Sequence, residues 1–401
     1  MLLKRDIVSL SWITAATAFR PSNPATTTIS SRSATHLAST VPFLRHRSVG
    51  SRITRSATIR AIHNSNINMT TPKYWNREEW KPTSYSGPVV QQARILSLAD
   101  PKDPNNLPLH EGDLPEGAQL LAIGTCLEEF DVPQLQTVQP NVLFVSHPKA
   151  REPLAELLQT FPSIEWVHTR SAGIDFCTSP TLADFATQGK IQVTNAKGCF
   201  SSTLAEYTMM ACSYFAKDLP RLLQQKRASD WQQYPILELR GATLGIIGYG
   251  DIGRATAKLA KAYGMKVIAL RRRPDQSQND PLVDQVYGKE SLNQIFAESD
   301  YILCSAPLTP ETEKMIGKEQ FDHAKKNSSG RGSAVFINVG RGPIVDEPAL
   351  VEALMDGRLK GAGLDVTAIE PLPKDSMLWK LDNVLLSPHN MDMTETFMKE
   401  S

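Results

Sequence analysis

The sequence predicts an α/β protein made of two Rossmann-like domains, and three observations lead to this expectation. Short apolar runs alternate with longer amphipathic segments, which is typical of βα units that build a parallel sheet. The alternation occurs in two blocks, separated by a long helical pattern at about residues 202–227. A GxGxxG loop opens the second block at Gly248. At 401 residues, the chain is long enough for two such domains.

Residues 1–75 differ in composition from the rest of the chain. They contain ten Lys or Arg against the single acid Asp6, and they are rich in Ser, Thr and Ala. A leader rich in Arg and Ser and poor in acids is typical of an organelle transit peptide. We expect import into mitochondria, with plastids as the alternative, or a cytosolic form if translation starts at Met69. A disordered tail or a mistaken gene start would give the same composition.

Composition also argues against several classes of protein. The apolar stretch at residues 7–19 is too short and too mixed to span a bilayer, so we expect no membrane association. Basic residues are spread thinly after the leader, so we expect no nucleic-acid surface. We predict no metal site. The cysteines are odd in number and lack CxxC pairing, which indicates reduced thiols in an intracellular protein: Cys126, Cys177, Cys199, Cys212 and Cys304.

The first block predicts a domain at residues 76–205. Proline and serine between residues 70 and 88 mark a linker into this domain. Its strand candidates are ARILSLAD, AQLLAIG, VLFVSH, IEWVHTRSAG and IQVTNAKG. The helical pattern that follows has apolar residues at three- and four-residue spacing, and Pro220 should bend the helix or end it.

The second block predicts a domain at residues 206–401. Its six buried-strand candidates are TLGIIGYG, KVIALRR, YILCSAP, AVFINVG, GAGLDV and NVLLSPH. With helical patterns between them, these strands fit a doubly wound Rossmann sheet. The segment NSSGRGS at residues 327–333 interrupts the alternation and should be an exposed turn.

The GxGxxG loop lies directly after an apolar strand and directly before a helical pattern. In such a loop the first glycine allows a tight turn, the second lets the backbone approach a pyrophosphate, and the third permits close helix packing. The pyrophosphate would lie at the helix N-terminus, where N–H groups and the dipole favour an anion. A glycine-rich turn without a ligand is the alternative. The loop residues predicted to bind a dinucleotide are Gly248, Tyr249, Gly250, Asp251, Ile252 and Gly253.

Arginines occupy the position where an acid normally binds the ribose of the dinucleotide. That acid is expected roughly 20 residues after the glycines, and Arg271 lies 18 residues past Gly253. A guanidinium cannot accept from ribose hydroxyls, but it pairs with a 2′-phosphate in a charge-assisted fork. We therefore predict NADP, with Arg271 and Arg272 as ligands, and keep NAD as a second option. A solvated charge run before Pro274, with Asp275 as the ribose partner, is the alternative.

Five motifs give a resemblance to a known family. They are ELRGATLGIIGYGDIGR, CSAPLTPETEKMIG, FINVGRGPIVDEPALVEAL, GAGLDVTAIEPLP and LLSPH, and they occur in the order seen in D-isomer-specific 2-hydroxyacid dehydrogenases. The segment TRSAGIDF resembles the substrate loop of that family's first domain. The resemblance extends from about Arg94 to His389. It implies a flavodoxin-like substrate domain, a doubly wound dinucleotide-binding domain and the reduction of a small 2-keto acid. Glyoxylate and hydroxypyruvate are favoured, because members with basic cofactor loops are often of that kind.

The resemblance further implies that Arg341, Glu370 and His389 are the catalytic residues. Reduction of a 2-keto acid adds hydride to C2 and a proton to the carbonyl oxygen, so a group that protonates near neutral pH must lie beside that oxygen. His389 suits this role, and a carboxylate such as Glu370 favours the imidazolium and orients the ring. Arg341 would bind the substrate carboxylate and polarise the carbonyl.

Other site residues follow from the same resemblance. The backbone N–H groups of Ala172 and Gly173 are expected to bind the substrate carboxylate, unless these residues form only a tight turn. Asp365 is expected to accept a hydrogen bond from the nicotinamide carboxamide, unless it is an ordinary loop acid. The remaining expected cofactor contacts are Pro307, Thr312, Val339 and Gly340.

Two features depart from the family pattern. Family members continue for some tens of residues past the SPH motif with a helix that returns to the first domain, whereas this sequence ends 12 residues after His389. We therefore expect that helix to be absent from this sequence. Asn390 and Met391 stand where small residues are common, which changes the expected shape of the nicotinamide pocket. A homodimer is usual in the family and is expected here.

Two other functions are weighed against this reading. Formate dehydrogenases are relatives that use a glutamine beside the histidine, and Glu370 argues against that activity. Transcriptional corepressors share the fold and keep the reacting residues, so an NAD(H)-sensing binding protein without significant turnover is the main alternative. The organelle-like leader argues against a nuclear role. Turnover with glyoxylate, hydroxypyruvate and pyruvate discriminates between an enzyme and a sensor.

Overall fold

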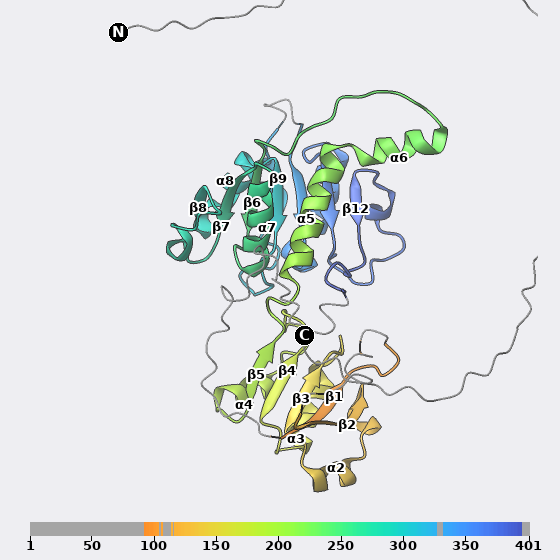
Figure 1. Ribbon diagram of the computed structural model, residues 1–401, viewed down its shortest axis with the longest axis vertical. Helices are drawn as coiled ribbons and strands as arrows, with labels where there is room; N and C mark the ends of the chain where they lie inside the picture. The colour runs from red at the N-terminus through yellow and green to blue at the C-terminus, as the bar shows by residue number, and fades with distance from the viewer. Residues whose placement is uncertain (1–91, 104–105, 107–113, 115, 327–331, 395–401) are drawn as a thin grey trace, which may run out of the picture. The chain divides into compact units, whose positions relative to one another are not determined.

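A computed structural model describes residues 92–103, 106, 114, 116–326 and 332–394 of the chain (Figure 1). The predicted leader and most of the predicted turn at residues 327–333 lie outside the described residues. Two parallel sheets organise the described part, one of five strands and one of seven. This arrangement confirms the prediction of an α/β fold with two Rossmann-like domains.

The first sheet has the strand order β2-β1-β3-β4-β5, which is the flavodoxin-like order. Every neighbouring pair is parallel. Its strands are β1 (Ala93–Leu98), β2 (Ala118–Gly124), β3 (Val142–Val145), β4 (Trp166–Thr169) and β5 (Gln192–Asn195). Its helices are η3 (Leu127–Glu129), α2 (Val132–Val138), α3 (Arg151–Thr160) and α4 (Pro180–Thr187). The five strands predicted for this domain are therefore confirmed. Leu154 of α3 packs with Leu96 and Leu143 in a fully buried core.

The long helical segment is two helices, α5 (Ser201–Ala216) and α6 (Leu219–Ala228). Asp218 between them has a φ of 51°, in the left-handed region. Pro220 stands in the first turn of α6, where its missing N–H costs no intrahelical hydrogen bond. The first helix therefore ends before the proline, as predicted. The expected domain boundary at residue 205/206 falls inside α5. None of the helices among the described residues has the length and apolar character needed to span a bilayer.

The second sheet has the order β12-β11-β10-β9-β6-β7-β8, a Rossmann arrangement with one additional strand. All six predicted strands are present in it. The strand β8 was missed because its three residues, QVY, are too few to give a period. The strands are β6 (Thr243–Ile247), β7 (Lys266–Leu270), β8 (Gln285–Tyr287), β9 (Tyr301–Cys304), β10 (Val335–Asn338), β11 (Gly361–Leu364) and β12 (Val384–Leu386).

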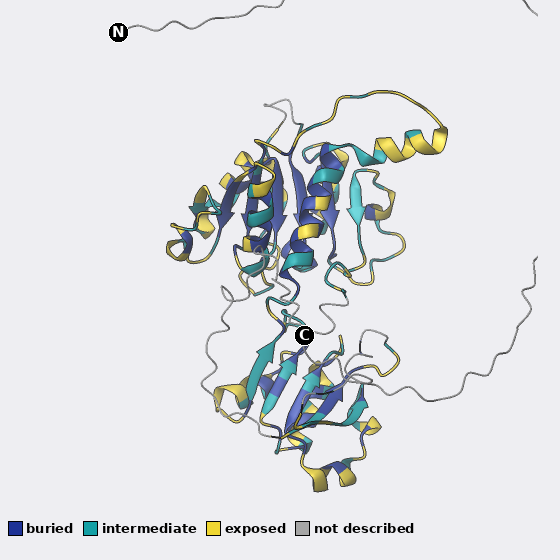
Figure 2. Ribbon diagram, viewed as in Figure 1, coloured by how far each residue is buried: buried dark blue, intermediate teal, exposed yellow. Residues whose placement is uncertain are grey.

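Helices cover both faces of the second sheet, so its central strands are buried throughout (Figure 2). Alternate residues of one strand enter opposite cores: Leu303 packs with α5 and α7, whereas Ile302 packs with α8, α9 and α10. Strands buried on both faces read as continuous apolar runs. The helices are α7 (Asp251–Ala262), α8 (Leu292–Glu298), α9 (Lys318–Asp322) and α10 (Glu347–Met355), with short 3-10 helices η4 (Pro274–Ser277), η5 (Lys289–Ser291), η6 (Gly342–Ile344) and η7 (Met377–Lys380).

The strand order of the second sheet reverses at β6, which lies between β7 and β9. In open α/β sheets, ligands bind outside the carboxyl ends of the strands at such a switch point. The loops that follow β6 and β9 meet there, because the Ser305 hydroxyl donates to the Gly248 carbonyl at 2.9 Å. The glycine loop therefore occupies the switch point.

Candidate active site

Backbone geometry explains the glycines of the GxGxxG loop. Gly248 has a φ of +93°, and a Cβ there would lie 2.6 Å from the backbone nitrogen of Ala306. A Cβ on Gly253 would lie 2.8 Å from the carbonyl oxygen of Gly248. By contrast, a Cβ on Gly250 would meet no atom within 4 Å. Helix α7 begins directly behind Gly250, with first-turn N–H groups that need partners. The loop thus offers the open cradle that a dinucleotide pyrophosphate requires.

A hollow of about 580 Å³ opens beside this loop. That volume is in the range of small-molecule and cofactor sites. The residues that form the wall of this hollow come mainly from the glycine loop, the start of α7 and the segment after β7. Its lining residues are Lys197, Tyr249, Gly250, Asp251, Arg254, Arg271, Asp275, Gln276, Ser277, Asn279, Asp280 and Pro281.

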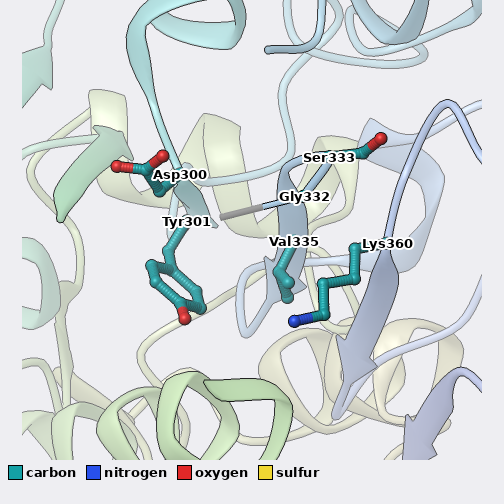
Figure 3. A pocket seen from close by; sticks show the side chains of 6 residues that line it. All are labelled: Asp300, Tyr301, Gly332, Ser333, Val335 and Lys360. Atoms are coloured by element: carbon teal, nitrogen blue, oxygen red, sulfur yellow. The ribbon is translucent and has the colours of Figure 1, made fainter. Parts of the chain in front are cut away.

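Another hollow lies at the opposite, amino-terminal ends of β9, β10 and β11 (Figure 3). Asp300, Val335 and Lys360 are among the residues that line it. Its volume is about 10 Å³, which is room for no more than a single water. This hollow therefore has no place for a cofactor or a substrate.

Of the predicted phosphate ligands, Arg271 lies in the wall of the larger hollow. Its guanidinium donates from Nη1 to the Ser277 hydroxyl and from Nη2 to Gln276 Oε1 at 2.8 Å. Arg272 is exposed and is not among the lining residues. Asp275, the alternative ribose partner, also lines the hollow. Geometry thus distinguishes Arg271 from its neighbour, which the sequence alone did not do.

Asp280 and Arg254 are among the wall residues that sequence reasoning missed. Asp280 Oδ2 accepts from the Tyr249 hydroxyl at 3.0 Å and from Arg254 Nε at 2.9 Å, which ties the segment after β7 to the glycine loop. Burial alone would raise the pKa of Asp280, but hydrogen bonds from Leu282, Arg254 and Tyr249 lower it overall. The position of Arg254 directly after GxGxxG was the only sequence signal for this contact.

A second charged contact borders the same loop. Asp251 places a carboxylate in the first turn of α7, beside the site expected for the cofactor phosphates. Lys197 Nζ lies 3.4 Å from Asp251 Oδ2 and offsets this negative charge. Lys197 follows β5, and nothing in its local sequence indicated a role at the glycine loop.

The loops after β9 and β10 form the other expected part of the cofactor site. The Thr312 hydroxyl donates to the Pro307 carbonyl at 2.7 Å, which fixes the turn of the first loop. Val339 is buried at the end of β10. A Cβ on Gly340 would lie 2.7 Å from the carbonyl oxygen of Ala306, so the two loops pack closely here. All four predicted residues therefore lie at the carboxyl edge of the sheet.

His389 and Glu370 form a hydrogen-bonded pair, with 2.8 Å between His389 Nδ1 and Glu370 Oε2. The Thr367 N–H donates to the other carboxylate oxygen at 3.0 Å and holds Glu370 in place. The bond to Glu370 raises the pKa of His389, and burial opposes this effect. Burial alone would raise the pKa of Glu370, but the bond and charge of His389 lower it overall. The structure thus brings the two predicted residues together, and the pKa directions favour an imidazolium beside a carboxylate.

Asp365 anchors the backbone that carries His389. The His389 N–H donates to the Asp365 carbonyl at 2.9 Å, and Asp365 Oδ1 accepts from the Ser387 hydroxyl at 2.7 Å and from the Asn390 N–H at 3.2 Å. These bonds hold His389 at a φ of 52°, a left-handed conformation that a residue with a Cβ adopts only when its surroundings impose it. Asp365 Oδ2 has no hydrogen-bond partner among the described residues, so it is available for the expected carboxamide contact.

Arg341 lies against the loop predicted to bind the substrate carboxylate. A Cβ on Gly173 would overlap the guanidinium, so glycine permits this close approach. Arg341 Nε lies 3.3 Å from Asp175 Oδ1, and Nη1 donates to the Gly340 carbonyl at 3.0 Å. The Ala172 carbonyl accepts from Asn195 Nδ2 at 2.8 Å, which fixes the loop. The structure therefore brings Arg341 and Gly173 together, and it adds Asp175, which sequence reasoning missed.

The structure shows a two-domain α/β protein with a glycine loop at the switch point of its second sheet and a hydrogen-bonded His389–Glu370 pair. Comparison with known proteins gives the family. Residues 209–390 match the family model for the D-isomer specific 2-hydroxyacid dehydrogenase, NAD binding domain. The chain belongs to the D-isomer specific 2-hydroxyacid dehydrogenases, a family of NAD(P)-dependent enzymes.

Curated relatives support this assignment. Glycerate dehydrogenase of Methylorubrum extorquens is 36% identical, over 59% of this chain and 71% of its own length. Glyoxylate/hydroxypyruvate reductase B of Yersinia pestis is 35% identical, over 58% of this chain and 70% of its own length. D-3-phosphoglycerate dehydrogenase of Methanocaldococcus jannaschii is 37% identical over 53% of this chain, and the match covers 40% of that longer protein.

Solved structures agree in fold. A family protein from Aeromonas salmonicida superposes with a TM-score of 0.61 at 28% identity, over 77% of this chain and 93% of its own. A family enzyme from Xanthobacter autotrophicus in complex with NADPH gives 0.61 at 26% identity, over 77% and 91%. D-Lactate dehydrogenase from Aquifex aeolicus with NAD and lactic acid gives 0.58 at 27% identity, over 76% and 91%.

Proposed function

We propose that the protein reduces a small 2-keto acid, of the glyoxylate or hydroxypyruvate kind, to the 2-hydroxy acid with NADPH. The observation that carries the proposal is the 2.8 Å bond between His389 and Glu370, because it raises the pKa of the histidine and so favours a proton donor. The names of the M. extorquens and Y. pestis relatives support small substrates of this class.

In the proposed reaction, each of the three predicted catalytic residues has a separate role. When bound, the nicotinamide supplies hydride for C2 of the substrate. The His389 imidazolium gives its proton to the carbonyl oxygen, and Glu370 stabilises that imidazolium and fixes its ring. Arg341, which lies against Gly173, holds the substrate carboxylate and polarises the carbonyl through charge-assisted hydrogen bonds.

The choice of NADPH rests on Arg271. Its guanidinium lies in the wall of the large hollow, fixed by Ser277 and Gln276, where the adenosine ribose of a dinucleotide on this loop would be expected. A fork held in place in this way pairs with a 2′-phosphate at reduced entropic cost. Relatives of similar fold have been solved with NADPH and with NAD, so family membership alone leaves both cofactors open.

Turnover tests the proposed function directly. The purified 401-residue chain should oxidise NADPH in the presence of glyoxylate or hydroxypyruvate, followed by absorbance, with the His389→Ala variant as the control for contaminating activity. Pyruvate completes the substrate panel. Binding of NADPH or NADH without turnover of any of the three acids would instead support a nucleotide-sensing protein.

We also propose a cellular location and an oligomeric state for the protein. We infer that residues 1–75 direct import into mitochondria, because their composition is rich in Arg and Ser and poor in acids. We also infer a homodimer, which sedimentation of the purified protein would test. Neither property is needed for the chemistry of His389 and Glu370.

A further inference from the structure

Lys197 is a basic residue beside the glycine loop to which the proposed reaction gives no role. It belongs to the loop between β5 and α5, and its Nζ lies 3.4 Å from Asp251 Oδ2. Both residues line the hollow of about 580 Å³. Among the described residues that line this hollow, Lys197 alone comes from the first predicted domain. One domain therefore contributes a cation to a hollow that the other domain forms.

The backbone of Lys197 is held in place. Its N–H donates to Asn195 Oδ1 at 3.3 Å, and Asn195 Nδ2 donates to the Ala172 carbonyl of the predicted substrate loop at 2.8 Å. The preceding residue, Ala196, is buried in the same core as Tyr249 of the glycine loop. The lysine side chain itself is 66% exposed, so its ammonium group is accessible to a ligand in the hollow.

The first turn of α7 combines two features that conflict when a phosphate binds. Its N–H groups favour an anion, but Asp251 places a carboxylate in the same turn. Two negative groups this close together repel each other. An ammonium that contacts both groups offsets the repulsion, and a lysine has three N–H donors with which to do so. Asp251 is the only acid within ion-pair distance of Lys197 Nζ among the described residues, which leaves donors for a phosphate oxygen.

The other two basic residues that line the hollow have different positions. Arg254 Nε donates to Asp280 Oδ2 at 2.9 Å. Arg271 lies in the segment after β7, where the proposed function assigns it to the 2′-phosphate. Lys197 is thus the lining cation that is paired with an acid in the first turn of α7, where the pyrophosphate is expected.

We propose that Lys197 binds the pyrophosphate of the dinucleotide, so that the first domain supplies a ligand to the cofactor. This inference rests on the proposed function. The ammonium group lies between the Asp251 carboxylate and the phosphate oxygens. Because Asn195 contacts both Lys197 and the Ala172 carbonyl, the phosphate ligand and the substrate loop share one set of contacts. The competing explanation is that Lys197 serves only as a countercharge for Asp251.

Binding without turnover tests the inference. The dissociation constants of NADPH, NADH and adenosine 2′-monophosphate are measured by calorimetric titration of the wild-type chain and of Lys197→Gln. The constants for both dinucleotides should rise about tenfold in the variant, because a charged hydrogen bond is lost. Adenosine 2′-monophosphate has no pyrophosphate, so its constant should not change. The loss should shrink in about 0.5 M salt, because salt screens exposed charges.

Lys190→Gln is the matched control, because it removes an exposed lysine near the opposite end of β5 and should leave all three constants unchanged. Unchanged dinucleotide binding in Lys197→Gln, or an equal loss with adenosine 2′-monophosphate, would overturn the inference. A wild-type chain that binds neither dinucleotide would instead refute the proposed function.

A double variant separates a phosphate ligand from a countercharge. Asp251→Asn removes the carboxylate that a countercharge would serve. If Lys197 binds the pyrophosphate directly, Lys197→Gln/Asp251→Asn should still bind NADPH about tenfold more weakly than Asp251→Asn alone. Equal dissociation constants for these two variants would show that Lys197 acts only on Asp251, and the inference would be wrong.

Discussion

Nδ1 of His389 lies 2.8 Å from Oε2 of Glu370, and this contact leaves Nε2 as the ring nitrogen that Glu370 does not bind. With Nδ1 bound to the carboxylate, Nε2 is the nitrogen that remains to donate a proton to a substrate oxygen. The Thr367 N–H holds the second carboxylate oxygen at 3.0 Å, so Glu370 cannot turn away from the ring without losing a bond. The Glu370 carboxylate and the His389 ring are therefore held in a fixed orientation relative to each other.

Replacing the proton donor should abolish most turnover and spare cofactor binding. In His389→Ala we expect kcat to fall roughly 100- to 10,000-fold, which is the usual contribution of a positioned acid–base group. The dissociation constant for NADPH, measured by fluorescence titration, should change little, because His389 is not among the residues that line the large hollow. Turnover near the wild-type rate would remove His389 from the mechanism.

Removing the charge of Glu370 should shift the pH profile to lower pH. Reduction needs protonated His389, so kcat/KM falls as the pH rises through the histidine pKa, which the hydrogen bond to Glu370 raises above its ordinary value. Glu370→Gln removes the negative charge that raises the pKa of His389. The fall of kcat/KM with rising pH should therefore occur at lower pH than in the wild type. Profiles of both proteins over pH 5–9 measure the shift. A limb that does not move would mean that another group titrates.

The wall position of Arg271 predicts the cofactor preference. Charged hydrogen bonds contribute about 1.5–3 kcal/mol, and roughly 1.4 kcal/mol is tenfold in binding. The wild type should therefore favour NADPH over NADH by tenfold or more, and Arg271→Asp should reduce or reverse that ratio. Arg273→Asp is the control, since Arg273 is exposed and does not line the hollow. A wild-type preference for NADH would show that the arginines are a solvated charge run.

Two glycines of the same loop should respond differently to serine. Gly250 has open space where a Cβ would stand, and serine is a good residue at the N-cap position it occupies, so Gly250→Ser should keep its melting temperature. Its affinity for the dinucleotide should fall about tenfold or more. Gly253→Ser would clash with the Gly248 carbonyl and should lose about 1–3 kcal/mol of stability. Equal melting temperatures for the two variants would contradict this reading.

The leader is testable separately from the enzyme. Residues 1–75 fused to a fluorescent reporter should direct it to mitochondria, because Arg-rich, acid-poor segments act as import signals. Replacing the arginines of the same fusion by glutamine is the control and should leave the reporter in the cytosol. A diffuse signal from the unaltered fusion would refute the inference, and a plastid signal would support the alternative compartment.

Local patterns in the sequence determined most of the fold, whereas Arg341, Glu370 and His389 were named as site residues from the family resemblance of their motifs. Apolar runs such as YILC and VFIN predicted buried parallel strands, because strands covered on both faces need no polar alternation. The GxGxxG spacing predicted the cradle, since a turn, an open approach and a close helix contact each require a missing side chain within six consecutive residues. These signals are short-range, so one sequence is enough to read them.

Only the tertiary structure decided which distant side chains complete the site. Asp280 contacts Tyr249, which lies 31 residues away in the sequence, and Lys197 of the first predicted domain contacts Asp251 of the second. The tertiary structure also distinguished Arg271, which is partly buried, from Arg272, which is exposed, although the sequence gave both the same predicted role. The physical reason is that these contacts depend on strand order: the sheet brings the ends of β6, β7 and β9 together, and no local residue pattern encodes which strand ends will be neighbours.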